Sequence, residues 1–181
     1  MRMTTGHFGI FVLSAAVYAA GNLGLPDISL AAIFPESLIA PLLSIGGPVP
    51  EKEVETLLYF IPGLIPVPFV AILGFPAVLG ITLGHLVTTT ISTIGAIDLI
   101  SPVFTFIGLT VIIFLRKQPV IVGALIYTAI AAAWMSVMRM VTLGLSFEST
   151  FPLAFIAQLT PIILGVIAFT IIKGTNLFKS E

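Results

Sequence analysis

The stretch 29–47, SLAAIFPESLIAPLLSIGG, is apolar and long enough to form a membrane-crossing helix, yet Pro35 and Glu36 stand near its middle. If this segment crosses a bilayer, Glu36 lies near mid-depth, where an acidic side chain costs roughly 2.5–3.5 kcal/mol on insertion scales. If the segment dips into the membrane or lies on its surface, that cost is avoided. The choice also decides on which side of the membrane each later loop lies.

The overall composition is that of a membrane protein. The chain has 181 residues, of which 58% are hydrophobic and only 8% charged, and a soluble domain needs more charge than this to cover its surface. The length suits one membrane domain over 1–181. The absence of cysteine excludes disulfides, thiolate metal sites and cysteine nucleophiles. A net charge of −1 gives no electrostatic footprint for nucleic acid.

Six apolar windows outside 29–47 fit a hydrocarbon core about 30 Å thick, which roughly 17–25 helical residues cross. Turn-forming residues such as Gly74 and Pro119 separate several of them. The first window follows Arg2 and is long enough to span, so we expect a retained helix rather than a cleaved signal peptide. The sequence predicts an all-α integral membrane protein with six transmembrane helices, over 8–25, 57–73, 77–94, 99–115, 120–138 and 153–172.

The distribution of charge favours a re-entrant or surface-lying segment between the first and second helices, within an external lid or loop region at 29–56. In that arrangement five basic residues lie on the side of both termini, and one, Lys52, lies opposite. If the segment spans the membrane, the two sides hold four and two basic residues instead. Because basic residues concentrate in cytoplasmic loops, we expect a multi-pass protein of the cell membrane with both termini in the cytoplasm. The five basic residues are Arg2, Arg116, Lys117, Lys173 and Lys179.

Polar residues within or beside the apolar windows are the candidates for a binding site, because each needs a partner or water. In the six-helix arrangement His85 lies near mid-depth and the others lie towards the external half, beside Met135 and Met138. This convergence predicts a solute-binding cavity that opens to the outside. Its predicted residues are Asn22, Glu36, His85, Asp98, Trp134, Arg139 and Gln158.

Structural roles remain open for the same residues. Thr and Ser in membrane helices commonly bond preceding carbonyls of their own helix, and a single histidine such as His85 suits packing as well as ligand contact. An ion pair with Asp98 or Glu148 also suits Arg139, as does a side chain that extends to the outer membrane interface. Catalysis has little support, since the chain has two histidines, no nucleotide-binding glycine loop and no nucleophile elbow. We expect no enzyme, catalytic residue, metal or cofactor.

The first window carries a stripe of small residues in the sequence SAAVYAAG. Two overlapping small-xxx-small pairs, Ala15/Ala19 and Ala16/Ala20, allow close approach of another helix. That helix belongs either to the same bundle or to another membrane subunit. The residues of the predicted partner interface are Ser14, Ala15, Ala16, Ala19 and Ala20.

Two stretches carry a resemblance to a known family. AAVYAAGNLGLPDISLAAIFPESL at 15–38 is similar to an alanine–tyrosine helix followed by a loop with a Glu-Ala-Leu-type motif. LGITLGHLVTTTISTIGAIDLISPVFTFIGL at 79–109 is similar to a glycine-rich helix, a Gly-x-x-Asp turn and the next helix. The chain resembles the substrate-binding S components of energy-coupling factor (ECF) transporters, and most closely the QueT-like members associated with a queuosine precursor.

This resemblance implies a substrate-capture subunit that takes a vitamin-like or nucleobase-like small molecule from outside the cell. It implies two kinds of partner, a membrane scaffold (T) subunit and two cytoplasmic ATPase subunits, besides the lipid bilayer. It also implies that 29–47 forms a lid over the site, with Glu36 directed into it. The alternative is a non-catalytic accessory subunit of another membrane complex, which requires the alanine stripe and no solute.

Overall fold

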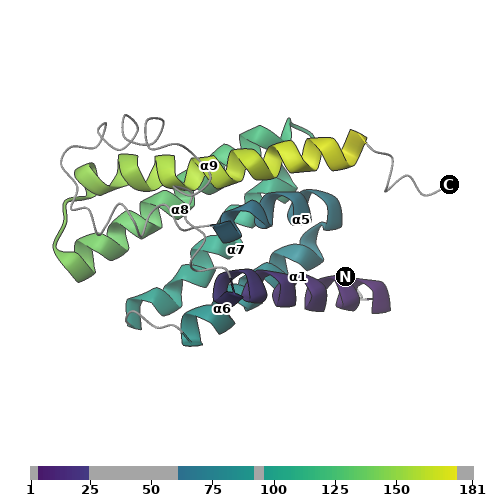
Figure 1. Cartoon of the computed structure of the whole chain (residues 1–181), viewed down its shortest axis with the longest axis horizontal. Coiled ribbons are helices and arrows are strands. Elements are labelled where there is room, and N and C mark those ends of the chain that lie inside the picture. The colour runs from purple at the N-terminus through teal and green to yellow at the C-terminus, as the bar shows by residue number, and fades with distance from the viewer. Residues whose placement is uncertain (1–3, 25–60, 92–95, 175–181) are drawn as a thin grey trace.

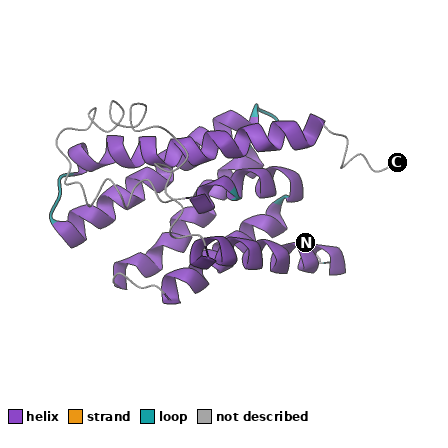
Figure 2. Ribbon diagram, viewed as in Figure 1, coloured by secondary structure: helices purple, strands orange, loops and turns teal. Residues whose placement is uncertain are grey.

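The structure, a computed structural model, describes residues 4–24, 61–91 and 96–174. All regular secondary structure in these ranges is helical, and they contain no strand (Figure 2). The segment 29–47, with Glu36, and the remainder of the predicted lid region at 29–56 lie outside the described residues, as do Arg2, Lys52 and Lys179. The all-α class predicted from the sequence is confirmed for the described part of the chain.

The described helices follow the predicted windows in order, with two short 3-10 helices among them. They are α1 (Thr5–Gly24), η1 (Ile61–Leu64), α5 (Pro66–Leu73), α6 (Phe75–Ile91), η2 (Ala96–Ile100), α7 (Ser101–Phe114), α8 (Val120–Leu143) and α9 (Phe147–Gly174).

Four helical stretches are long and apolar enough to cross a membrane, namely Thr5–Leu23, Ala96–Phe114, Val120–Leu143 and Phe147–Gly174, and α6 is a shorter apolar helix. Large apolar side chains remain exposed on the outside of the bundle, among them Phe114 at 80% and Ile91 at 65%. In water such a surface would drive aggregation, whereas lipid solvates it. The predicted second window is described only as η1 and the 8-residue α5.

The long helices lie roughly alongside one another (Figure 1). One end of the bundle gathers the first turn of α1, the α5–α6 junction, the α7–α8 turn and the last turns of α9. Their residues His7, Gly74, Arg116 and Lys173 line a common groove. We call this end the basic end. The sequence predicts that these four segments share one side of the membrane, and the structure places them together.

The closest helix contact in the bundle is between α1 and α6. Gly80 and Gly84 form a G-x-x-x-G motif on α6, and a Cβ at Gly80 would overlap the carbonyl oxygen of Phe11. A Cβ at Gly84 would lie 2.6 Å from the Ala15 carbonyl oxygen. Small residues permit this approach because only backbone separates the helices. The contact aligns Tyr18 of α1 with His85 of α6, whose ring centroids are 5.8 Å apart.

This contact divides the small-residue stripe of α1 between two environments. Ser14 is fully buried, and it and Ala15 pack against α6 of the same chain. Ala15 and Ala19 are half-buried, whereas Ala16 and Ala20 are exposed on the other face. Part of the predicted partner interface is therefore an internal packing surface, and only the pair Ala16/Ala20 offers an open small-xxx-small face.

Two helix boundaries lie five or six residues beyond the predicted windows. Helix α8 continues to Leu143, beyond the predicted end at 138, and stops where Gly144 takes a left-handed conformation with φ 70°. Helix α9 begins at Phe147 rather than 153, because the Ser146 hydroxyl accepts the Ser149 N–H at 3.2 Å and caps the helix. Glu148 thus lies in the first turn of α9 rather than in a loop, where the helix dipole favours its charge.

The α1–α6 contact predicts a strong difference between two identical substitutions. Gly80→Leu should lower the free energy of unfolding of the purified protein by about 1–3 kcal/mol or more, since the leucine side chain must displace the backbone of α1. Gly9→Leu is the matched control, because a Cβ at Gly9 meets nothing within 4 Å. Thermal unfolding in detergent, followed by circular dichroism, measures both. Equal stability of the two variants would contradict this packing.

Candidate functional site: a polar cavity at one end of the bundle

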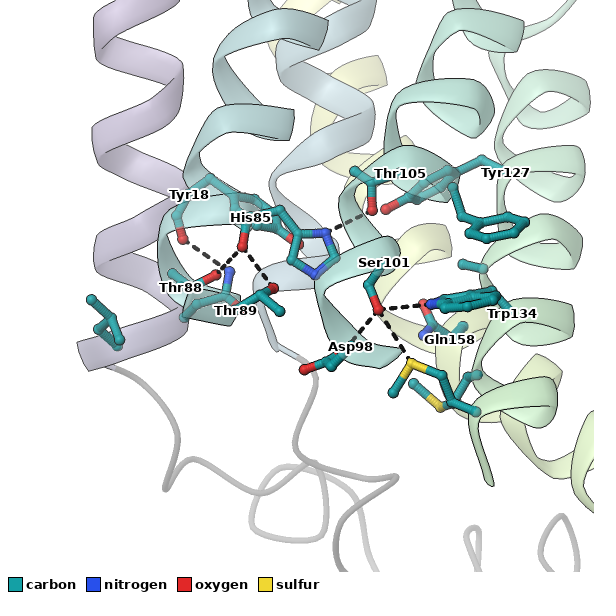
Figure 3. A pocket seen from close by; sticks show the side chains of 16 residues that line it. Tyr18, His85, Thr88, Thr89, Asp98, Ser101, Thr105, Tyr127, Trp134 and Gln158 are labelled. Carbon is teal, nitrogen blue, oxygen red and sulfur yellow. Dashed lines mark hydrogen bonds between the residues drawn. The ribbon is translucent and has the colours of Figure 1, made fainter. Parts of the chain in front are cut away.

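A cavity of about 310 Å³ lies between α1, α6, η2, α7, α8 and α9. It is at the end opposite the basic end, where α1 and α6 finish and η2 begins (Figures 1 and 3). Its lining combines hydroxyl, amide, imidazole and carboxylate groups with aromatic and thioether surfaces. The lining residues are Tyr18, Asn22, Leu23, His85, Thr88, Thr89, Asp98, Ser101, Phe104, Thr105, Tyr127, Ala131, Trp134, Met135, Met138 and Gln158.

Ser101 is the centre of a hydrogen-bond chain on one wall (Figure 3). The Trp134 Nε1–H donates to Ser101 Oγ at 2.7 Å, and Ser101 Oγ donates to Asp98 Oδ1 at 2.7 Å. Ser101 Oγ also lies 3.2 Å from Met138 Sδ. Ser101 is 5% exposed, so these hydrogen bonds lie in the interior. They tie α7 and η2 to α8 and fix the indole ring. Asp98 uses Oδ1 for Ser101, so Oδ2 can accept a hydrogen bond from a solute.

His85 is held on the opposite wall by α7. Its Nδ1 lies 2.8 Å from Thr105 Oγ1, and Figure 3 shows the second ring nitrogen directed away from Thr105, towards Asp98 and Ser101. The next two threonines, Thr88 and Thr89, donate to the carbonyl oxygen of His85 at 2.9 and 2.8 Å. The prediction that the threonine run bonds preceding carbonyls is confirmed for these two residues. The imidazole therefore presents one nitrogen to the cavity from a fixed ring.

Aromatic rings form the apolar part of the lining. Phe104 and Trp134 stack with centroids 4.2 Å apart and an interplanar angle of 12°, a geometry typical of favourable ring pairs. Tyr18 is fully buried against the cavity, and its hydroxyl oxygen has no hydrogen-bond partner within the described residues. A buried hydroxyl without a partner costs free energy, so Tyr18 places a polar atom in the wall of the cavity at a cost to folding.

The structure brings together most of the residues that the sequence singled out. Asn22, His85, Asp98, Trp134 and Gln158 all line the cavity, and so do Met135 and Met138. Asn22 donates to the Tyr18 carbonyl oxygen at 3.0 Å, which leaves its amide oxygen as an acceptor. Gln158 is 4% exposed.

Two predicted residues are not placed in this cavity. Arg139 follows Met138 on α8 and is half-buried, but it is not among the lining residues. Met138 reaches the cavity from the last turns of α8, whereas Arg139, about 100° further round the helix, does not. Glu36 lies outside the described residues.

Among the polar lining residues that sequence reasoning missed are Tyr18, Ser101, Thr105 and Tyr127. Spacing could have found three of them. Tyr18 stands four positions before Asn22, and Ser101 and Thr105 follow Asp98 at steps of three and four, which places each set on one helix face. Tyr127 carries a weaker signal, because the nearest predicted site residue on its own helix, Trp134, stands seven positions later.

The chemistry of the cavity is that of recognition. Asp98 is its only charged lining residue within the described ranges, since neither lysine nor arginine reaches it. The same ranges hold no group of three or more His, Cys, Asp or Glu side chains that could bind a metal ion. The lining offers hydrogen bonds from several directions together with flat aromatic surface. Comparisons with protein-family models, curated proteins and solved structures find no match for the chain.

The Ser101 hydrogen-bond chain predicts a specific effect of one substitution. Ser101→Ala leaves the Trp134 N–H without its acceptor and should cost about 1–3 kcal/mol of stability. Trp134 is the only tryptophan of the chain, so its emission should also shift, which steady-state fluorescence measures directly.

Ser136→Ala is the control for this substitution. Ser136 is equally buried, but its hydroxyl donates only to the Ala132 carbonyl of its own helix at 2.8 Å, and loss of such a bond has little effect on a helix. If Ser101→Ala left both emission and unfolding unchanged relative to Ser136→Ala, Ser101 would not hold the indole.

Proposed function

We propose that this protein is the substrate-capture (S) subunit of an ECF-type importer, which binds a vitamin-like or nucleobase-like small molecule. The observation that carries the proposal is the cavity at one end of an apolar helical bundle. There Asn22, His85, Asp98 and Gln158 arrive from four separate elements and face one volume. Polar groups within a membrane bundle are expensive, whether half-buried like the first three or buried like Gln158, so their convergence supports a function that uses them.

The size and lining of the cavity suit a small flat heterocycle. A volume of about 310 Å³ lies at the lower end of the range for small-molecule sites. The stacked rings of Phe104 and Trp134 offer aromatic surface, whereas Asp98, the Asn22 amide oxygen and the free His85 nitrogen offer partners for polar ring edges. A vitamin-like or nucleobase-like molecule presents both kinds of surface at once.

The proposed topology has six transmembrane helices, with 29–47 as a re-entrant or surface-lying segment between the first and second. The basic end faces the cytoplasm, because Arg116, Lys117 and Lys173 lie there and cytoplasmic loops collect basic residues. Asp98 and Glu148 lie near the opposite end. The cavity then opens to the outside of the cell membrane, from which a solute would enter.

Transport by this route requires partners, a membrane scaffold subunit and two cytoplasmic ATPases. The open face of α1 at Ala16 and Ala20 supports contact with a scaffold helix, since both residues are small and exposed. The same face also supports the second candidate function, a non-catalytic accessory subunit of another membrane complex. The two functions differ in one respect, because only the first needs the cavity to hold a solute.

The test is mass spectrometry of small molecules that co-purify with the protein. Wild-type protein should carry a stoichiometric solute. His85→Ala and Asp98→Asn should each weaken its binding by at least about tenfold, because removal of one buried partner typically costs about 1–3 kcal/mol. Titration calorimetry with the identified solute measures these affinities.

Glu148→Gln is the matched control for Asp98→Asn. Glu148 is the other acidic residue of the described ranges, and it does not line the cavity. Its variant should bind as the wild type does, and all three variants should unfold at similar temperatures. Wild-type affinity in both His85→Ala and Asp98→Asn would exclude solute capture at this site and favour the accessory subunit.

A further inference from the structure

A second groove, of about 1080 Å³, lies at the basic end of the bundle, far from the polar cavity. The α5–α6 junction, the α7–α8 turn and the last turns of α9 border it (Figure 1). Its walls are apolar and include Ile113, Ile121 and Phe169, whereas Arg116 and Lys173 stand among its lining residues. The groove thus joins an apolar slot to two cations.

The charge in this groove has one sign. Within the placed part of the chain no acidic side chain lines it, and the acidic residues there, Asp98 and Glu148, belong to the opposite half of the bundle. Arg116 and Lys173 are both exposed at helix ends. The ammonium of Lys173 lies 5.9 Å from the centroid of the Phe169 ring, so its aliphatic stem follows the apolar wall while its charge stays at the rim.

We infer that this groove binds an anionic phospholipid, with the lipid phosphate at Arg116 and Lys173 and an acyl chain along the apolar wall. Basic pockets between membrane helices are suited to anionic headgroups. The apolar lining decides between a lipid and free phosphate, because a free anion would gain nothing from Ile113, Ile121 or Phe169. Gln118 and Thr170 also line the groove and can hydrogen-bond a glycerol headgroup. The inference does not depend on the proposed transport function.

Native mass spectrometry of the purified protein in detergent tests the site, with dioleoyl phosphatidylglycerol titrated against dioleoyl phosphatidylcholine. The wild type should retain the anionic lipid selectively. Each cation near an anionic lipid surface contributes about fivefold in affinity. Arg116→Gln or Lys173→Gln should therefore weaken retention by about fivefold, and the double variant by roughly thirtyfold. If the double variant does not purify, the two single variants give the same contrast.

Lys117→Gln is the matched control, since Lys117 is adjacent to Arg116 and equally exposed but does not line the groove. It should retain the lipid as the wild type does. If Lys117→Gln lost as much lipid retention as Arg116→Gln, the attraction would be diffuse and the site would be overturned. Equal retention of phosphatidylcholine and phosphatidylglycerol by the wild type would also overturn it. A final arm titrates inorganic phosphate and glycerol phosphate. Competition by either at concentrations similar to those of the lipid would assign the groove to a free anion instead.

Discussion

The backbone contact between α1 and α6 is the constraint on which the rest of the structure depends. Gly80 and Gly84 bring the two helices so close that a methyl group at either position would strike the backbone of α1. In lipid no hydrophobic effect drives helices together, so association relies on such close packing and on hydrogen bonds. The contact fixes Tyr18 and His85 on facing helices, and these residues form one wall of the polar cavity.

The opposite wall is fixed by side-chain hydrogen bonds rather than by backbone contact. Ser101 joins Asp98 and Trp134, and Thr105 holds the His85 ring. These five residues connect η2, α7, α8 and α6 at the cavity end. This part of the site is preorganised, because each of these groups is already bonded to the protein. The remaining lone pairs and the stacked rings of Phe104 and Trp134 are left for a solute.

Much of this arrangement could be predicted from the sequence, because bilayer thickness sets helix length and charge asymmetry sets which ends lie together. Those two rules predict that the loops at Gly74 and Arg116 lie at the same end of the bundle. They also predict that Asn22, His85 and Asp98 converge. Helix rotation does not follow from them. It leaves Arg139 out of the cavity lining, sets Ser14 and Ala15 against α6, and brings in Tyr127. Local chemistry also mattered, since the Ser146 cap starts α9 six residues before the predicted window.

The proposed topology requires that the cavity opens to water on the outer side of the membrane, and cysteine labelling in intact cells can show whether it does. The chain contains no cysteine, so Met135→Cys in the cavity, Ser149→Cys near the same end and Gln118→Cys at the basic end each report one position. An impermeant maleimide should label Met135→Cys and Ser149→Cys, and should label Gln118→Cys only after permeabilisation. Labelling of Gln118→Cys in intact cells, or an unreactive Met135→Cys beside a labelled Ser149→Cys, would contradict the account.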